Sequence, residues 1–232
     1  MTVKASWRAL IDDVLAELER LSELDAATVL LVGSVARHAD TAASDIDVLV
    51  ISPKQLKRVQ TSPKAQVFMI TRSRFLERLR GGDDFPHWVV RFGEVLSDKS
   101  RWWERLMRDP AIDTWPDWER KLNQAGARLS FASRLYASGD YDHAAEEFLL
   151  SARHLARAVL LKDRIFPLSQ PELPKQLREQ GCAELADLVD ALADGSSDRA
   201  VLSRAERLLA EWLNRLSKAE KGSRRRKRAA VT

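Results

Sequence analysis

The spacing of apolar residues predicts a helix, several strands and a second helix in the first hundred residues. Apolar side chains recur every three or four residues over 7–21, which predicts an amphipathic helix. Three short segments are apolar and rich in β-branched residues, as strands are. They are 28–32, 45–51 and 67–70. Residues 71–82 resemble a helix between a Thr or Ser cap and a glycine stop, and 91–98 a fourth strand or hairpin arm. This order predicts a small mixed α/β unit with a sheet of about four strands.

Helical spacing dominates the second half of the chain, and no convincing strand follows residue 102. Residues 110–121 contain two prolines and predict a junction, with the domain boundary near 109–118. Four helical stretches follow, joined by short polar loops. They are 122–136, 141–162, 170–180 with 184–192, and 198–217. We therefore expect an α+β protein with a mixed-sheet domain at 1–110 and an antiparallel four-helix bundle at 119–220.

Composition and apolar run lengths predict a globular protein without membrane contact. The chain has 232 residues and 45% hydrophobic content, enough for two small domains. Its longest apolar runs, 29–32 and 46–51, are far shorter than a membrane span, and the N-terminus lacks the order of a signal peptide. We expect a cytoplasmic location. The single cysteine, Cys182, excludes an internal disulfide and a cysteine-type zinc site.

The net charge of +4 is concentrated in five basic residues at 224–228. Without them the rest of the chain is close to neutral. The sequence predicts a disordered basic tail at 221–232. Two interpretations stay open at this point. The favoured one is a solvated tail that aids solubility, and the other is a weak contact with nucleic-acid phosphates.

The stretch "VLLVGSVARHADTAASDIDVLVIS", residues 29–52, contains the chemistry that stands out. Strand side chains alternate faces, so Asp45 and Asp47 point the same way. Two carboxylates this close repel each other, and partial burial increases the repulsion. They can share a hard divalent cation, and Mg²⁺ takes one or two protein carboxylates together with substrate phosphate oxygens. Gly33 lets the backbone approach closely, and Ser34 with the following amides can bind phosphate beside that metal.

These residues resemble the signature of the minimal nucleotidyltransferases of the DNA polymerase beta superfamily. The match consists of Gly33-Ser34, then Arg37, then the run from Ser44 to Asp47 between two strands. The helical half resembles HEPN-type bundles or the C-terminal domain of kanamycin-type nucleotidyltransferases, on its architecture.

The resemblance implies a role for each matched residue. Gly33, Ser34 and Ser44 would bind a nucleoside triphosphate, for which ATP is our first expectation, and Arg37 would support the loop or the phosphates. Asp45 and Asp47 would be catalytic and would ligate one or two Mg²⁺ ions. A substrate hydroxyl would attack the α-phosphorus and release pyrophosphate.

Two positions depart from that family pattern. His38 stands where the family has glycine. The third carboxylate, expected on the strand after the Asp pair, falls at or near Gln66, and residues 48–76 contain no Asp or Glu. Glutamine can ligate a metal through its carbonyl oxygen but cannot act as a general base. Candidate replacements are Glu146 and Glu147 in the helical half, then Glu94 on the next strand. The acidic run around Glu146 also fits a helix cap followed by a solvated helix face.

Two functions therefore compete. The leading hypothesis is a magnesium-dependent nucleotidyltransferase whose acceptor is an antibiotic hydroxyl, a protein tyrosine or an RNA end. The alternative is a degenerate module that binds nucleotide or a protein partner, in the manner of an antitoxin. A homodimer is a further expected partner. RNA cleavage is disfavoured, because neither His143 nor His154 follows an arginine at the HEPN spacing. The spacing does occur between Arg80 and His87, in a segment read as a loop.

Overall fold

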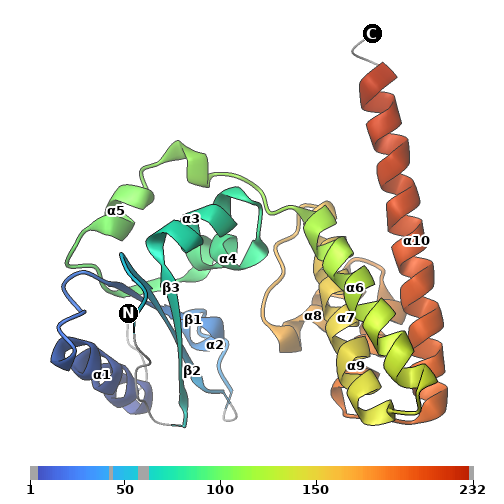
Figure 1. Ribbon diagram of the computed structural model, residues 1–232, viewed down its shortest axis with the longest axis horizontal. Helices are drawn as coiled ribbons and strands as arrows, with labels where there is room; N and C mark the ends of the chain where they lie inside the picture. The colour runs from blue at the N-terminus through green and yellow to red at the C-terminus, as the bar shows by residue number, and fades with distance from the viewer. Residues whose placement is uncertain (1–4, 42–43, 57–62, 230–232) are drawn as a thin grey trace. The chain divides into compact units, whose positions relative to one another are not determined.

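The computed structural model describes residues 5–41, 44–56 and 63–229 (Figure 1). The chain divides into two compact units, Met1–Pro116 and Asp117–Thr232. The first unit contains a sheet and helices. The described residues of the second unit form helices and no strand. The predicted α+β class, a mixed-sheet domain followed by a helical region, is confirmed.

The first unit is built on a four-stranded mixed sheet with the order β3-β2-β1-β4. The strands are β1 Thr28–Val32, β2 Ile46–Ser52, β3 Ala65–Thr71 and β4 Glu94–Ser97. β1 runs antiparallel to β2 and to β4, and β2 runs parallel to β3. The three longer strands occupy the predicted segments. β3 forms one edge of the sheet.

Helices cover both faces of this sheet (Figure 1). α1, Ala5–Arg20, packs Val14 and Leu18 on the face formed by Leu31, Val48 and neighbouring apolar side chains. Three helices belong to the other side. They are α3 Arg72–Arg80, α4 Asp84–Phe92 and α5 Trp102–Leu106. The alternation along each strand thus separates a face packed against α1 from a second face that carries Asp47.

The segment after α3 corrects the predicted loop. Residues 81–87 read as a loop because they contain two glycines and a proline, yet α4 begins at Asp84 and includes His87. Asp83 caps this helix by accepting a hydrogen bond from the Phe85 amide at 3.2 Å. Pro86 stands in the first turn, where a helix does not need the missing N–H. The predicted strand at 91–98 shortens accordingly to β4.

The second unit consists of packed helices around a leucine- and alanine-rich core. The helices are α6 Trp118–Ala137, α7 Tyr141–Lys162, α8 Leu173–Glu179, α9 Ala183–Ala193 and α10 Arg199–Ala229. The third predicted helix is therefore two helices, α8 and α9. Gly181 breaks them with a positive φ of 72°, a conformation that favours glycine.

α10 continues through the basic run at 224–228, where the sequence predicted a disordered tail, and ends at Ala229. Residues 230–232 of that predicted tail lie outside the described residues. Among the helices in the described part of the chain, none combines the length and the apolar character needed to cross a membrane.

Candidate active site

The centre of the site is the contact between the Asp47 carboxylate and the backbone of Gly33. β1 ends at Val32, which pairs with Asp47 on β2. The next residue, Gly33, begins the short helix α2, Gly33–Ala36, with a positive φ of 75°. A Cβ atom at Gly33 would lie 2.2 Å from Asp47 Oδ2. A side chain here would force the Asp47 carboxylate to move and would hold a backbone conformation that favours glycine.

Asp45, Asp47 and Gln66 lie together where β2 and β3 begin. The parallel register pairs Asp47 directly with Gln66. The Gln66 side chain turns toward the carboxylates, and its Nε2 donates a hydrogen bond to Asp45 Oδ2 at 2.5 Å. Gln66 thus occupies the place beside Asp47 where the family resemblance expected a third carboxylate.

The repulsion between two neighbouring carboxylates, which the sequence predicted, affects the pKa of Asp47. Asp47 is half-buried. Its burial, together with the negative charge of Asp45, raises its pKa from 3.8 to about 6. A carboxylate near neutral pKa is typical of a site arranged to receive a cation.

The loop between α2 and β2 brings Ser34 next to the Asp pair. Ser34 Oγ donates a hydrogen bond to Ser44 Oγ at 3.2 Å, and Ser44 directly precedes Asp45. Ser44 Oγ in turn accepts from the Thr41 backbone N–H at 2.9 Å. Residues 42–43 of this motif lie outside the described residues. The loop therefore closes on itself through serine and threonine hydroxyls, so that Gly33, Ser34 and Asp45 belong to one small region.

His38 and Arg37 show how the loop accommodates its departure from the family pattern. His38 adopts a left-handed conformation with φ of 55°, which is why glycine suits this position. The guanidinium of Arg37 lies over the Phe92 ring, 5.4 Å from its centroid. Arg37 thereby links the loop to α4, which supports its predicted role in holding the loop.

Glu94, a predicted replacement for the missing carboxylate, does not face the Asp pair. It begins β4 and pairs with Leu31, whereas Asp47 pairs with Val32. Adjacent strand residues point to opposite faces, so Glu94 lies on the α1 side of the sheet. β4 is also separated from β2 by β1.

The other two candidates belong to the second unit. Glu146 and Glu147 lie on α7, where Glu146 is exposed. Glu147 accepts two hydrogen bonds from Arg128 Nη1 at 2.9 Å. Asp140, at the start of the same acidic run, binds His143 Nδ1 at 2.8 Å. Asp140 and Glu147 therefore have partners within their own unit, and a role of Glu146 or Glu147 as general base stays a prediction.

The Asp pair fits a magnesium ion that completes its shell with substrate oxygens. The described residues contain no group of three or more His, Cys, Asp or Glu side chains that could hold a metal. Two neighbouring carboxylates are nevertheless the protein share that Mg²⁺ often takes in phosphate-binding sites. Gln66 can add a carbonyl oxygen if its amide turns over, because an amide offers a donor and an acceptor end.

Comparison with solved structures finds a nucleotidyltransferase-like protein from Exiguobacterium sibiricum 255-15, with 17% sequence identity and a TM-score of 0.45. The match covers 90% of this chain and 74% of that one. The search of curated proteins gave no match.

Comparison with protein families gives a match to the nucleotidyltransferase domain over residues 11–100. That range begins within α1 and ends shortly after β4, and it contains Gly33, Ser34, Asp45, Asp47 and Gln66. The resemblance of the helical half to HEPN-type or kanamycin-type domains stays a prediction. Residues 11–100 are thus similar to nucleotidyltransferase domains, and the Asp pair with its glycine lies inside the matched range.

Proposed function

We propose that the first unit is a magnesium-dependent nucleotidyltransferase that transfers a nucleoside monophosphate from a nucleoside triphosphate, ATP by expectation, to a hydroxyl acceptor. The observation that carries this proposal is the Asp47 carboxylate against the Gly33 backbone, beside Asp45. Two carboxylates that would share a metal ion lie beside a glycine backbone that would bind phosphate, and the family match to nucleotidyltransferase domains covers these residues.

Each side chain of the site has a role that follows from its position. Asp45 and Asp47 would hold Mg²⁺. Its positive charge would offset the negative charge of the triphosphate and of the oxygens that become more negative during the reaction. The backbone amides at Gly33 and Ser34 would bind phosphate oxygens, and the Ser34 hydroxyl would exchange its bond to Ser44 for a phosphate. Gln66 keeps Asp45 oriented through its amide.

The reaction replaces one phosphorus–oxygen bond with another. The acceptor oxygen forms a bond to the α-phosphorus, and the bond to the bridging oxygen breaks. Pyrophosphate leaves with that electron pair. The acceptor hydroxyl must lose its proton, and general-base assistance contributes about 10² to 10⁴ in rate. Gln66 cannot accept this proton. The general base would therefore be a carboxylate and not this glutamine, and Glu146 and Glu147 stay the first candidates from the sequence.

Nucleotide binding tests the metal role directly. Calorimetry with a non-hydrolysable ATP analogue should show affinity that rises with Mg²⁺. Asp47→Asn should weaken the Mg²⁺-dependent part of the affinity at least about tenfold, which corresponds to about 1.4 kcal/mol. Asp25→Asn is a matched control, because Asp25 is an exposed carboxylate that pairs with Lys99. Equal affinity with and without Mg²⁺ in the native protein would contradict the proposal.

Transfer assays test the source of the base. Incubation with each labelled nucleoside triphosphate and Mg²⁺, with and without cell extract, should reveal the acceptor. If Glu146 or Glu147 is the base, its replacement by Gln should lower the rate about 10²-fold or more, and Gln66→Asp should change the native rate little. A protein without turnover that gains transfer through Gln66→Asp would instead be the degenerate binding module.

A further inference from the structure

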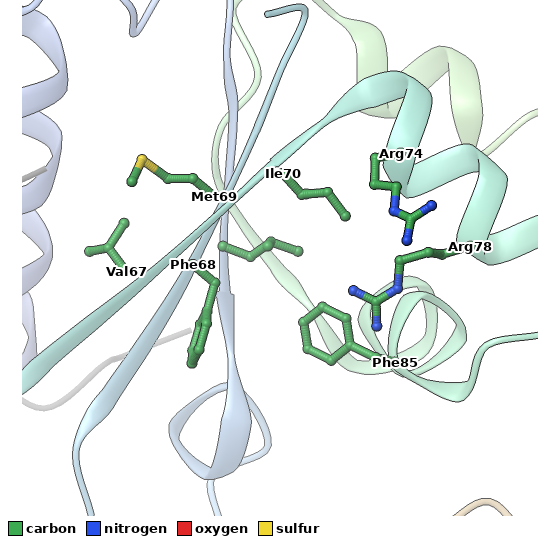
Figure 2. Close-up of a pocket in the computed structure, with 8 residues that line it drawn as sticks. Val67, Phe68, Met69, Ile70, Arg74, Arg78 and Phe85 are labelled. Carbon is green, nitrogen blue, oxygen red and sulfur yellow. The ribbon is translucent and has the colours of Figure 1, made fainter. Parts of the chain in front are cut away.

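A pocket of about 610 Å³ lies at the β3 edge of the sheet, and Leu49, Phe68 and Ile70 of its lining share the sheet face of the Asp pair. Its lining comes from the sheet and from two helices. The residues are Leu49, Val67, Phe68, Met69, Ile70, Arg74, Arg78 and Phe85. Figure 2 shows Ile70 and Phe68 bordering the same space as Arg78 and Phe85, while Val67 and Met69 extend to the other side of β3.

Strand register connects this pocket to the candidate active site. Leu49 is two residues beyond Asp47 on β2, and it pairs with Phe68, which is two residues beyond Gln66 on β3. Residues two apart on a strand share a face and lie about 7 Å from each other. The pocket therefore begins one step along the strands from the Asp pair.

The geometry of the transfer reaction indicates from which side of the α-phosphorus the acceptor approaches. In-line displacement places the attacking hydroxyl and the leaving pyrophosphate on opposite sides of the α-phosphorus. Gly33 and Ser34, the proposed phosphate site, follow β1 on one side of β2. β3, with Gln66 and Phe68, lies on the other side of β2. An acceptor opposite the leaving group therefore approaches from β3.

The walls of the pocket suit a flat apolar group. Leu49 and Ile70 come from the sheet, and Phe68 on the edge strand β3 is 44% exposed. An aromatic ring exposed to this degree beside a pocket offers a stacking surface.

The opposite wall is held in place by its own contacts. The Arg78 guanidinium lies over the Phe85 ring, 5.4 Å from its centroid, and its Nε donates to the buried Asp83 carboxylate at 2.9 Å. Arg74 Nη1 binds Glu77 at 2.7 Å. A preorganised wall costs a ligand less ordering entropy on binding.

We infer that this pocket binds the acceptor of the transfer, and that the acceptor is a hydroxyl compound carrying a flat apolar ring without positive charge. The inference rests on the proposed function. The pocket lining contains two arginines and no carboxylate. A polycationic amino sugar would find no anionic partner there, whereas a ring can stack on Phe68 and interact with the guanidinium groups. The acceptor hydroxyl then reaches the α-phosphorus beside Gln66.

A fluorescent ring tests the pocket with the full chain. The probe is 1-anilinonaphthalene-8-sulfonate, which combines flat rings with a negative charge. We expect Phe68→Ala to weaken its binding at least about fivefold, the lower end of what aromatic stacking contributes. Phe131→Ala is the matched control, because Phe131 is 42% exposed on α6, and it should leave the affinity unchanged. A non-hydrolysable ATP analogue with Mg²⁺ should bind without displacing the probe.

Each alternative result separates the two proposals. Equal probe affinity in Phe68→Ala and the native protein would overturn the pocket. Displacement of the probe by the nucleotide would also overturn the acceptor assignment, since the pocket would then hold the nucleobase. Absence of Mg²⁺-dependent nucleotide binding in the native protein would overturn the proposed function and with it the acceptor role. Circular dichroism of both variants verifies that they fold.

Discussion

Gly33 and Asp47 depend on each other, because the Asp47 carboxylate occupies the space that a side chain at position 33 would need. Gly33 combines a positive φ with a missing Cβ that would lie 2.2 Å from Asp47 Oδ2. A short motif in the sequence therefore corresponds to a contact between β1 and β2. His38, four residues from Ser34, shows that the same loop tolerates a left-handed residue with a side chain where space allows it.

Replacing Gly33 should damage both the fold and the site. Gly33→Ala should lower the free energy of unfolding by about 1 to 3 kcal/mol, because the new methyl group displaces Asp47 in a conformation that already disfavours alanine. It should also abolish Mg²⁺-dependent nucleotide binding. Urea titration and calorimetry measure the two effects.

Gly126 provides the control for that experiment. It lies within α6, and a Cβ atom there would meet nothing within 4 Å. Gly126→Ala should therefore stabilise the protein by about 0.5 to 1 kcal/mol, through helix propensity alone. Similar destabilisation by both substitutions would contradict the proposed contact between Gly33 and Asp47.

The raised pKa of Asp47 predicts how stability depends on pH in the metal-free protein. Its pKa is about 6 in the folded protein and 3.8 without these surroundings. The folded state therefore binds this proton more tightly than the unfolded chain, and the stability linked to Asp47 is lost as pH rises from about 4 to about 6. Asp47→Asn should be more stable than the native protein at pH 8, by on the order of 1 kcal/mol.

The same comparison at low pH supplies the control. Below about pH 4 Asp47 is largely protonated in the folded and in the unfolded state, so the stability advantage of Asp47→Asn over the native protein should disappear. Thermal unfolding in a chelating buffer across pH 4 to 8 measures this. A native protein that is more stable than Asp47→Asn at pH 8 without metal would contradict the assigned burial and repulsion.

At the scale of elements, α3 and α4 together form the helical wall of the pocket, α3 through Arg74 and Arg78 and α4 through Phe85. Asp83 caps α4 through Phe85 and pairs with Arg78 of α3, so one buried carboxylate joins two helices. The Arg78 guanidinium then covers the Phe85 ring. The geometry of the pocket therefore depends on how α3 and α4 meet as well as on the residues that line it.

Substitutions at Asp83 should separate its two roles. Asp83→Ala should cost about 2 to 4 kcal/mol, because it removes a cap and leaves Arg78 without this partner. Asp83→Asn keeps a good cap and should cost less. Asp117→Ala removes an exposed cap of α6, where Asp117 accepts from the Glu119 amide at 2.9 Å, and should cost only about 1 kcal/mol. Chemical unfolding compares the three. Equal losses at Asp83 and Asp117 would show that the contact with Arg78 adds nothing.

At the scale of the whole molecule, the end of α10 differs from the proposed active site. It carries five basic residues at 224–228, far along the chain from the Asp pair. Truncation after residue 222 removes the run at 224–228 and should leave the unfolding midpoint unchanged. If this segment contacts nucleic acid, truncation should abolish retention on a DNA or RNA column. The log affinity of the full chain should fall with log salt with a slope of at most about five. Retention that survives truncation would leave solubility as the function of this segment.

The sequence by itself determined the features that depend on neighbours along the chain. Periodicity located the strands and most helices, because side-chain alternation and helical spacing are local. The shared face of Asp45 and Asp47 follows from one strand, and the glycine before Ser34 from one turn. The family match over residues 11–100 agrees with what these few residues predicted.

Tertiary structure decided everything that depends on how separate segments pair. Register between β2 and β3 places Gln66 beside Asp47, and the pairing of β4 with β1 turns Glu94 to the opposite face. A proline and two glycines suggested a loop where Asp83 and the packing of α4 stabilise a helix. The pocket joins Phe68 to Phe85 across a strand and two helices. Such contacts arise from burial shared between distant parts of the chain, and local spacing carries no information about them.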